Sequence, residues 1–363
     1  MQQKPLHILI SPLDWGLGHA SRCIPVIDQL IKAGHKVTIA GYGRSIILLQ
    51  KEFPHLNSIE MQGFSPSYSK AGNMVLHLLM LLPHFMGSIF REHRNLKKLL
   101  TQYTFDIIIS DNRYGFWNKQ ICSIFITHQV MIKTPAWLKF AEYPLYRISR
   151  MLICNFDECW IPDYKASPGL SGDLSHKYPL PKNAKFIGPL SRFQKPETSS
   201  DKKPDDVKIT AIISGPEPQR SLFEDLIAKQ LNGSNHSSTI VSGKPESEKA
   251  VIANARLTIL PHLSTDKMCS LISCSSLVIC RSGYSSVMDL HVLGIKALFV
   301  PTPGQTEQIY LAELHQNAGA VLWREQESLN LKVDIGAALK FTGFIYTTAE
   351  LSINATVADL KKK

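Results

Sequence analysis

The amino-acid sequence predicts an α/β protein made of two doubly wound, Rossmann-like parallel-sheet domains that face each other across a cleft. The chain of 363 residues is too long for one ordinary domain, and its 44% hydrophobic and 19% charged residues can fill two cores. Short apolar runs alternate with helical patterns in both halves, which is typical of parallel sheets covered on both faces. Between the halves the composition changes to a stretch rich in Pro, Gly, Ser, Asp and Lys. Ligands of such sheets bind beyond the carboxyl ends of the strands, so we expect the binding site in the cleft.

The expected N-terminal domain covers residues 1–162. Its predicted elements, in order, are a strand at His7–Ser11, a helix at Ser21–Ala33 and strands at Lys36–Ala40, Asp106–Ser110 and Ile121–Thr127. Gly34 follows the helix directly, and a glycine in that place commonly ends a helix. The apolar runs are near-continuous rather than alternating, which favours strands buried on both faces.

The expected connection covers residues 163–206, and Phe186–Leu190 is its last ordered piece. The expected C-terminal domain covers residues 207–363, and its last helix can pack back on the first domain. Its predicted elements are strand Lys208–Ser214, helix Ser221–Leu231, strands Ser238–Val241 and Leu257–Leu260, helix Thr265–Ser273, strand Leu277–Cys280, helix Ser285–Leu293 and strand Ala297–Val300.

The net charge and the search for targeting signals restrict the classes of binding partner that we expect. The net charge is +10, yet we find neither basic clusters interleaved with aromatic residues nor a nucleic-acid reading motif. A small anionic substrate or an anionic membrane surface therefore fits this charge better than nucleic acid. The sequence has no secretion signal and no run of the ~18–20 apolar residues that span a bilayer. We expect a cytoplasmic protein, with the inner face of the cytoplasmic membrane as a candidate location.

The first motif, Pro12–Arg22, follows the first strand directly. Gly16 and Gly18 allow the backbone to turn tightly and approach a ligand. A dinucleotide-binding fingerprint would need a third glycine where Arg22 stands and a carboxylate after the second strand, and both are missing. The motif therefore argues against a nicotinamide or flavin oxidoreductase.

His19 lies where the helix of this motif begins and is a candidate general base, because histidine titrates near neutral pH. Asp14 either orients His19 or is itself the base. Arg22 is expected to pair with a carboxylate or a phosphate.

The second motif, Leu277–Leu290, is a buried strand, a Ser-Gly turn and the start of a helix. A helix start offers free N–H groups and a positive dipole, which suit a diphosphate without a metal ion. The residues of this expected cradle are Ser282, Gly283, Ser285 and Ser286. Asp289, one turn into the helix, can accept hydrogen bonds from a ribose diol.

The third motif, Ala297–Gln308, is a strand followed by a loop that Pro301 and Pro303 stiffen. The loop presents Gln305, Glu307 and Gln308. Amide and carboxylate groups are donors and acceptors that suit the hydroxyl groups of a sugar.

Together these motifs resemble glycosyltransferase family 28, the family of the peptidoglycan N-acetylglucosaminyltransferases. The residues that carry the resemblance are Cys280–Gly283, the acidic residue six positions after that glycine, Ala297–Pro301, Gln308 and Asn317–Ala320. The resemblance is close over residues 257–321 and patchy elsewhere, through Gly16–His19, Thr127–Gln129 and Gly188–Arg192. It implies the GT-B fold, in which the donor site lies in the C-terminal domain.

The resemblance also implies a uridine diphosphate (UDP)-sugar as co-substrate, no cofactor and no metal ion, and the sequence contains no Asp-x-Asp pair. Asp289 would hold the ribose, and His262 and Leu263 would complete the nucleoside site. Gln308 would bind the donor sugar, and His19 would lie near the reacting centre. The residues that would contact the diphosphate are Gly16, Gly18, Arg192, Ser214, Gly215, Ser282 and Gly283. After Ser214 and Gly215 the sequence departs from the family, since Pro216 and Pro218 lack N–H donors.

The expected activity is that of an inverting, metal-independent glycosyltransferase that moves a sugar from a UDP-sugar to a hydroxyl acceptor. His19 or Asp14 would take the acceptor proton, while the helix start at 282–286 and Arg192 or Arg220 would stabilise the departing diphosphate. The alternatives are a nucleotide-sugar hydrolase of the nonulosonic acid pathway type, a UDP-sugar 2-epimerase and a non-catalytic nucleotide-sugar-binding protein.

A membrane surface is a candidate partner. Met74–Met86 is apolar and is followed by Arg91, Arg94, Lys97 and Lys98, and 135–150 combines aromatic with basic residues. Such a composition suits interfacial binding and a lipid-linked acceptor of the cell envelope. An ordinary buried helix explains the first segment equally well.

Overall fold

In the computed structural model, residues 4–63, 82–194 and 207–346 are described. Each half of the chain builds a seven-stranded sheet, with strand orders β3-β2-β1-β4-β5-β6-β7 and β10-β11-β9-β8-β12-β13-β14. Every neighbouring pair of these strands is parallel except β10 and β11, which are antiparallel. The prediction of two doubly wound α/β units is confirmed.

The first sheet consists of β1 (His7–Pro12), β2 (Lys36–Gly41), β3 (Asn57–Glu60), β4 (Ile107–Asp111), β5 (Cys122–Ile126), β6 (Glu158–Ile161) and β7 (Ala184–Phe186). Its helices are α1 (Leu17–Lys32), α2 (Gly43–Glu52), α4 (Leu82–Leu100), η1 (Ala136–Ala141), α5 (Glu142–Ile153) and α6 (Asp173–His176). The central strands β1 and β4 are almost wholly buried, as their near-continuous apolar sequences predict.

The second sheet consists of β8 (Lys208–Ile212), β9 (Ser237–Val241), β10 (Val251–Asn254), β11 (Leu257–Leu260), β12 (Leu277–Cys280), β13 (Ala297–Phe299) and β14 (Val321–Trp323). Its helices are α7 (Gln219–Asn232), α8 (Thr265–Ser273), α9 (Tyr284–Leu293), α10 (Thr306–Asn317), η2 (Gln326–Ser328) and α11 (Leu331–Ala338). Gly294 ends α9 in the left-handed conformation, with φ 67° and ψ 30°.

The largest differences between the structure and the expected element boundaries concern α1 and the connection. Helix α1 begins at Leu17 rather than Ser21, because Gly16 turns the chain at φ 98° and lets the helix start at once. The first sheet also extends beyond residue 162: α6 and β7 lie within the stretch expected to be a connection, and β7 pairs with β6. The expected helix at the C-terminus falls outside the described residues.

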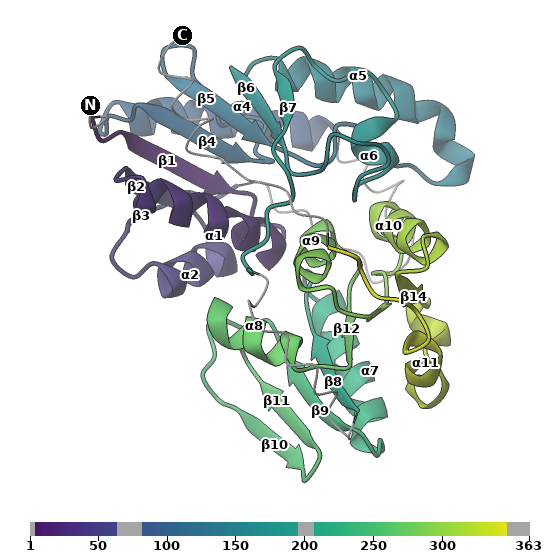
Figure 1. The fold of residues 1–363 in the computed structure, drawn as a ribbon. Helices are drawn as coiled ribbons and strands as arrows, with labels where there is room; N and C mark the ends of the chain where they lie inside the picture. Colours follow the sequence, from purple (N-terminus) through teal and green to yellow (C-terminus); the bar gives the residue numbers. More distant parts are fainter. Residues whose placement is uncertain (1–3, 64–81, 195–206, 347–363) are drawn as a thin grey trace.

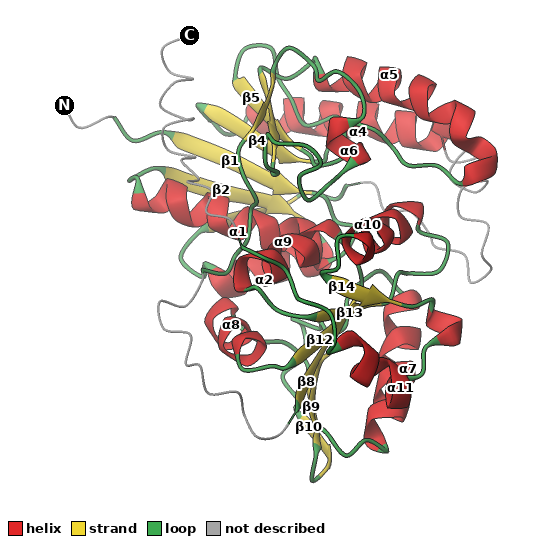
Figure 2. Cartoon of the chain, turned by 45° about the vertical axis from the view of Figure 1, so that its right-hand side comes forward, coloured by secondary structure: helices red, strands yellow, loops and turns green. Residues whose placement is uncertain are grey.

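In the views of Figures 1 and 2 one sheet lies above the other, and helices lie between them. Helices α1 and α9, which start at the carboxyl ends of β1 and β12, contact each other, and α10 lies beside them on the same level (Figure 1). The two helix starts that carry the glycine and serine motifs are therefore brought together from opposite domains. No helix among the described residues combines the length and the apolarity that a membrane span needs.

Candidate functional site

A cleft between the two sheets collects most of the residues that the sequence motifs single out. Expected site residues that line the cleft are Gly16, Gly18, His19, Arg192, Ser214, Gly215, His262, Gly283, Ser285, Ser286, Asp289, Gln305, Glu307 and Gln308. Asp14, Ser282 and Leu263 are not among its lining residues. Both domains and the segment between them contribute, so the cleft is completed only by the whole fold.

His19, in the first turn of α1, is paired with a carboxylate that the sequence motifs did not indicate. Its Nδ1 lies 3.0 Å from Oδ1 of Asp111, the fully buried last residue of β4. Burial alone would raise the pKa of Asp111, but Arg22 and His19 outweigh it and lower that pKa to about 2. Asp111 is therefore a permanent carboxylate beside the imidazole at neutral pH.

His19 itself is neutral at neutral pH. Burial, followed by the charge of Arg22, lowers the pKa of His19 more than Asp111 raises it. Arg22 also approaches Nδ1 of His19, at 2.8 Å, but its Nη2 already bonds to Oδ1 of Asp111. In the tautomer that carries the proton on Nδ1, this proton is donated to Oδ1 of Asp111. Nε2 is then left with a free lone pair, as a general base requires.

Arg22 is buried and bonds to several members of this network. Its expected pairing with a carboxylate is confirmed. Its Nε donates to Oδ2 of Asp111 at 2.6 Å, and its Nη1 donates to Nδ1 of His128 at 3.0 Å. One guanidinium group thus holds the partner of the candidate base and a second histidine.

Asp14 makes other contacts than those that the first motif suggested. Its carboxylate accepts hydrogen bonds from the backbone N–H groups of Tyr42 and Gly63, both at 3.3 Å. Burial raises the pKa of Asp14 more than Arg113 and these N–H groups lower it. The expectation that Asp14 orients His19 is wrong, because Asp111 occupies that place. The signal that could have found Asp111 is its position directly after a buried apolar strand, at the ligand-binding edge of the sheet.

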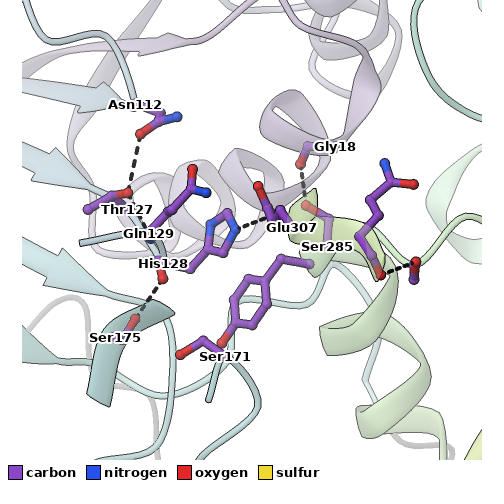
Figure 3. Close-up of polar contacts among 12 residues, drawn as sticks. Gly18, Asn112, Thr127, His128, Gln129, Ser171, Ser175, Ser285 and Glu307 are labelled. Carbon is purple, nitrogen blue, oxygen red and sulfur yellow. Dashed lines mark hydrogen bonds and ion pairs between the residues drawn. The ribbon is translucent and has the colours of Figure 1, made fainter. Parts of the chain in front are cut away.

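The start of α9 faces the start of α1. Ser285 Oγ donates to the carbonyl oxygen of Gly18 at 2.8 Å, across the two domains (Figure 3). A Cβ atom at Gly283 would meet no atom within 4 Å, so the space beside this helix start is open. Ser282 is fully buried, and its hydroxyl donates to the carbonyl oxygen of Gln308 at 2.7 Å. Ser282 anchors the first turn of α10 instead of lining the expected diphosphate cradle.

Asp289 and Arg192 form the neighbouring part of the cleft. Asp289 accepts a hydrogen bond from Ser191 at 2.7 Å, and Nε of Arg192 lies 3.7 Å from its other oxygen. Burial raises the pKa of Asp289 more than these partners lower it. Nε of Arg192 is buried and makes no hydrogen bond to the described residues. An anionic ligand could satisfy it.

His262 lines the cleft close to this cationic group. Burial, together with Arg192 and Lys51, lowers the pKa of His262 to about 4, so the ring is uncharged at neutral pH. Leu263, its neighbour, packs against the core and does not line the cleft. Arg220 is almost fully buried, held by Glu217 and Glu224, and is also absent from the lining.

The first turn of α10 carries two polar side chains whose orientations are fixed. Gln308 Oε1 accepts the backbone N–H of Thr302 at 2.8 Å, so its amide NH₂ group remains as a donor. Glu307 Oε1 is bonded to Nε2 of His128 at 2.8 Å (Figure 3). Burial would raise the pKa of Glu307, but His128, His19 and Arg22 together outweigh it, so the pKa is lowered and the carboxylate is charged.

Comparisons with known proteins agree with this architecture. Residues 223–362 match the glycosyltransferase family 28 C-terminal domain, and residues 7–124 match glycosyl transferase family 1. An uncharacterized glycosyltransferase of Methanosarcina mazei is 24% identical over 336 residues, which are 86% of this chain and 85% of the relative.

Two further similarities are to a named transferase and to a solved structure. A UDP-N-acetylglucosamine–N-acetylmuramyl-(pentapeptide) pyrophosphoryl-undecaprenol N-acetylglucosamine transferase of Sulfurihydrogenibium is 22% identical over 320 residues, 87% of this chain and 84% of its own. The crystal structure of MurG from Acinetobacter baumannii superimposes with a TM-score of 0.56 at 16% identity, covering 99% of this chain and all of that one (100%). The fold is that of these enzymes.

Proposed function

We propose that this chain, a glycosyltransferase of the GT-B fold with a family 28 C-terminal domain, moves a sugar from a UDP-sugar to a hydroxyl acceptor with inversion and without a metal ion. The observation that carries the proposal is the His19–Asp111 pair, which faces an open helix start of the other domain across the cleft. A base on one side and an anion-binding helix start on the other are what a displacement at a sugar phosphate needs.

The reaction is a single displacement. Nε2 of His19 takes the proton of the acceptor hydroxyl while its oxygen forms a bond to the anomeric carbon of the donor. The bond from that carbon to the diphosphate oxygen breaks, and its electron pair leaves with the diphosphate. Asp111 stabilises the imidazolium that forms on His19, as the carboxylate of a catalytic triad does. Attack from the side opposite the leaving group inverts the anomeric centre.

The leaving diphosphate gains negative charge, and two features of the cleft can stabilise it. The first is the start of α9, where Gly283 leaves the N–H groups accessible and Ser286 adds a hydroxyl. The second is Arg192, whose buried Nε makes no hydrogen bond to the described residues. The neighbouring Asp289 would accept the ribose hydroxyls, and neutral His262 would border the base.

The hexose of the UDP-sugar would contact one hydrogen-bond acceptor and one hydrogen-bond donor. Glu307 is a charged carboxylate that accepts a hydroxyl proton, whereas the free amide group of Gln308 donates. Two adjacent side chains of opposite hydrogen-bonding character suit two neighbouring hydroxyl groups of a hexose. The hydrolase and epimerase alternatives gain no support, since the relatives described above are all transferases.

The test is transfer of sugar from a UDP-hexose with and without EDTA, followed as UDP release, in wild-type protein and in His19→Ala. We expect transfer that survives EDTA and is lost in the variant, while calorimetry shows that the variant still binds the donor. Retention of the anomeric configuration in the product, seen by proton NMR, would contradict the inverting mechanism.

We also propose that the acceptor is lipid-linked and that η1 and α5 contact the membrane surface, at the inner face of the cytoplasmic membrane. Trp137 and Phe140 are 63% and 78% exposed, and Lys139 and Arg147 are exposed beside them. The acceptor of the Sulfurihydrogenibium relative is, by its name, a pyrophosphoryl-undecaprenol. The other expected membrane segment, Met74–Met86, falls mostly outside the described residues.

Flotation with vesicles that contain anionic lipid tests the membrane contact. Wild-type protein should float with these vesicles, and a Trp137→Ser, Phe140→Ser double variant should float less while its unfolding curve is unchanged, because both side chains are exposed. Equal flotation of the two proteins would remove η1 from the proposal.

A further inference from the structure

His128 is a buried histidine in the cleft to which the reaction assigns no role. It follows β5 and is 6% exposed. Its backbone is held in place, because Ser175 Oγ donates to the carbonyl oxygen of His128 at 2.6 Å (Figure 3). Its ring stacks on Tyr284 of the other domain, with 4.2 Å between ring centroids and 1° between the planes. The position of this ring is therefore fixed from both sides of the cleft.

The two ring nitrogens of His128 have different partners, and these define the tautomer. Nδ1 lies 3.0 Å from Nη1 of Arg22, and a guanidinium group can only donate, so Nδ1 accepts. The proton of the neutral ring is therefore on Nε2. Nε2 lies 2.8 Å from Oε1 of Glu307, and it donates to that carboxylate.

From this chain of contacts we propose that His128 is a positioning residue for the donor sugar. It orients the carboxylate of Glu307, and through Arg22 it joins that carboxylate to the Asp111–His19 pair. The proposal rests on the proposed function, because it assigns to Glu307 the hydroxyl groups of the donor sugar.

The hydrogen bond from His128 preorganises the side chain of Glu307 for binding the sugar. A glutamate side chain has several rotamers, and ordering one of them on binding costs free energy. His128 occupies Oε1 of Glu307, which fixes the side chain and leaves Oε2 for a sugar hydroxyl. Since the side chain of Glu307 is 29% exposed, it would otherwise be free to turn toward solvent.

The hydrogen bond between His128 and Glu307 also joins the two domains. His128 belongs to the first sheet's domain, whereas Glu307 begins α10 of the second. The neighbouring Thr306 Oγ1 donates to the carbonyl oxygen of Lys133 at 2.8 Å, so two residues in the first turn of α10 are bonded to the other domain. Glu307 is therefore oriented only while the two domains are in contact, and recognition of the donor sugar depends on that contact.

Two substitutions separate the two bonds of His128. In His128→Asn the amide oxygen can replace Nδ1 as the acceptor for Arg22, but the side chain is too short to reach Glu307. In His128→Gln the amide nitrogen can replace Nε2 as the donor to Glu307. Both variants lose the ring that stacks on Tyr284, so each is the control for the other.

The measurements are the KM for a UDP-hexose and the Kd for UDP alone. A hydrogen bond to a charged group corresponds to about a tenfold change or more, so we expect the KM of His128→Asn to rise by about that factor. The Kd for UDP should be unchanged, because UDP lacks the hexose that would contact Glu307. His128→Gln should recover most of the donor KM.

Several results would overturn the proposal. Equal KM values in wild type and His128→Asn would show that Glu307 needs no partner. Equal loss in the Asn and Gln variants, or weaker UDP binding in step with the donor, would show that His128 supports the cleft only as packing. A wild-type protein that binds UDP but no UDP-sugar would contradict the proposed function itself, and this proposal with it.

A second measurement needs no donor. Nitrogen-15 NMR of the histidine rings reports which nitrogen carries the proton. We expect Nδ1 of His128 to be unprotonated and Nε2 to be protonated. A proton on Nδ1 would exclude the bond from Arg22 and overturn the proposal even if transfer activity is found.

Discussion

At the scale of single residues, the account depends on which carboxylate serves His19. Asp111 contacts His19 and Arg22, whereas Asp14 contacts two backbone N–H groups away from the cleft lining. The two aspartates lie at the same end of the first sheet, but Asp111 is fully buried whereas Asp14 is only partly buried.

Asp111→Asn should lower kcat by about 10³-fold or more, because the amide neither favours the required His19 tautomer nor stabilises the imidazolium. Asp14→Asn should leave kcat within a few-fold of wild type. Burial already raises the pKa of Asp14, so loss of its charge costs little. Steady-state kinetics of both variants check this, and a larger loss in Asp14→Asn would return the base role to Asp14.

The pH dependence follows from the lowered pKa of His19. The base is active when it is unprotonated, so kcat/KM should rise with pH through the pKa of His19 and then level off. Burial and Arg22 place that pKa below the ordinary histidine value of about 6.5. A pH–rate profile should therefore keep its plateau down to pH values below about 6.5. An acidic limb centred above that value would mean that His19 is not the base.

Most of the residues that sequence reasoning proposed for the site, His19 among them, line one cleft, because glycine and serine at a strand-to-helix turn are local signals. Sequence reasoning missed Asp111 and His128, whose roles come from contacts at separations of 89 residues to Arg22 and 179 residues to Glu307. No local pattern carries such contacts. It also read Ser282 as a ligand, although the hydroxyl is used within the protein.

At the scale of elements, the starts of α1 and α9 are glycine turns with different constraints. Gly16 has φ 98°, a conformation that residues with a side chain rarely adopt. Gly283 has φ −69°, and a Cβ there would meet no atom within 4 Å. The first glycine is required by the backbone, the second by the space that a ligand would fill.

Gly16→Ala should therefore lower the free energy of unfolding by about 1–3 kcal/mol, the usual cost of such a backbone conformation. Gly283→Ala should leave that free energy unchanged within about 0.5 kcal/mol and weaken the binding of UDP. Urea denaturation and calorimetry measure the two effects. Unchanged UDP binding in a folded Gly283→Ala protein would contradict the diphosphate site at α9.

The central strands were predictable because they are near-continuous apolar runs bounded by turn residues. The edge strand β3 was not, since three of its four residues are exposed and its sequence has no apolar pattern. Helix α1 begins four residues before the predicted start (Leu17 rather than Ser21), because the positive φ of Gly16 lets the helix begin directly after it.

At the scale of the whole molecule, contacts join the two domains on both sides of the cleft. Opposite the contact of His128 with Glu307, Arg44 of α2 lies 2.7 Å from Glu246 and 3.5 Å from Glu217. Glu52 accepts the backbone N–H of Thr265 at the start of α8, at 2.9 Å. The sequence predicts that two such domains face each other, but not which side chains meet.

The ion pairs of Arg44 are open to water, with side chains 34%, 37% and 44% exposed for Arg44, Glu246 and Glu217. Arg44→Ala should therefore change the free energy of unfolding by less than about 1 kcal/mol. A loss of 2 kcal/mol or more in urea denaturation would show that these pairs are shielded from water when the domains meet.

The central claim is that the cleft binds a UDP-sugar without a metal ion. Its most direct test is calorimetric titration of the purified protein, in EDTA, with uridine, guanosine and thymidine diphosphates and with UDP-hexoses. We expect the protein to bind the uridine forms selectively and the Asp289→Ala variant to bind them more weakly. Absence of binding, or equal binding of all three nucleotides, would contradict this claim.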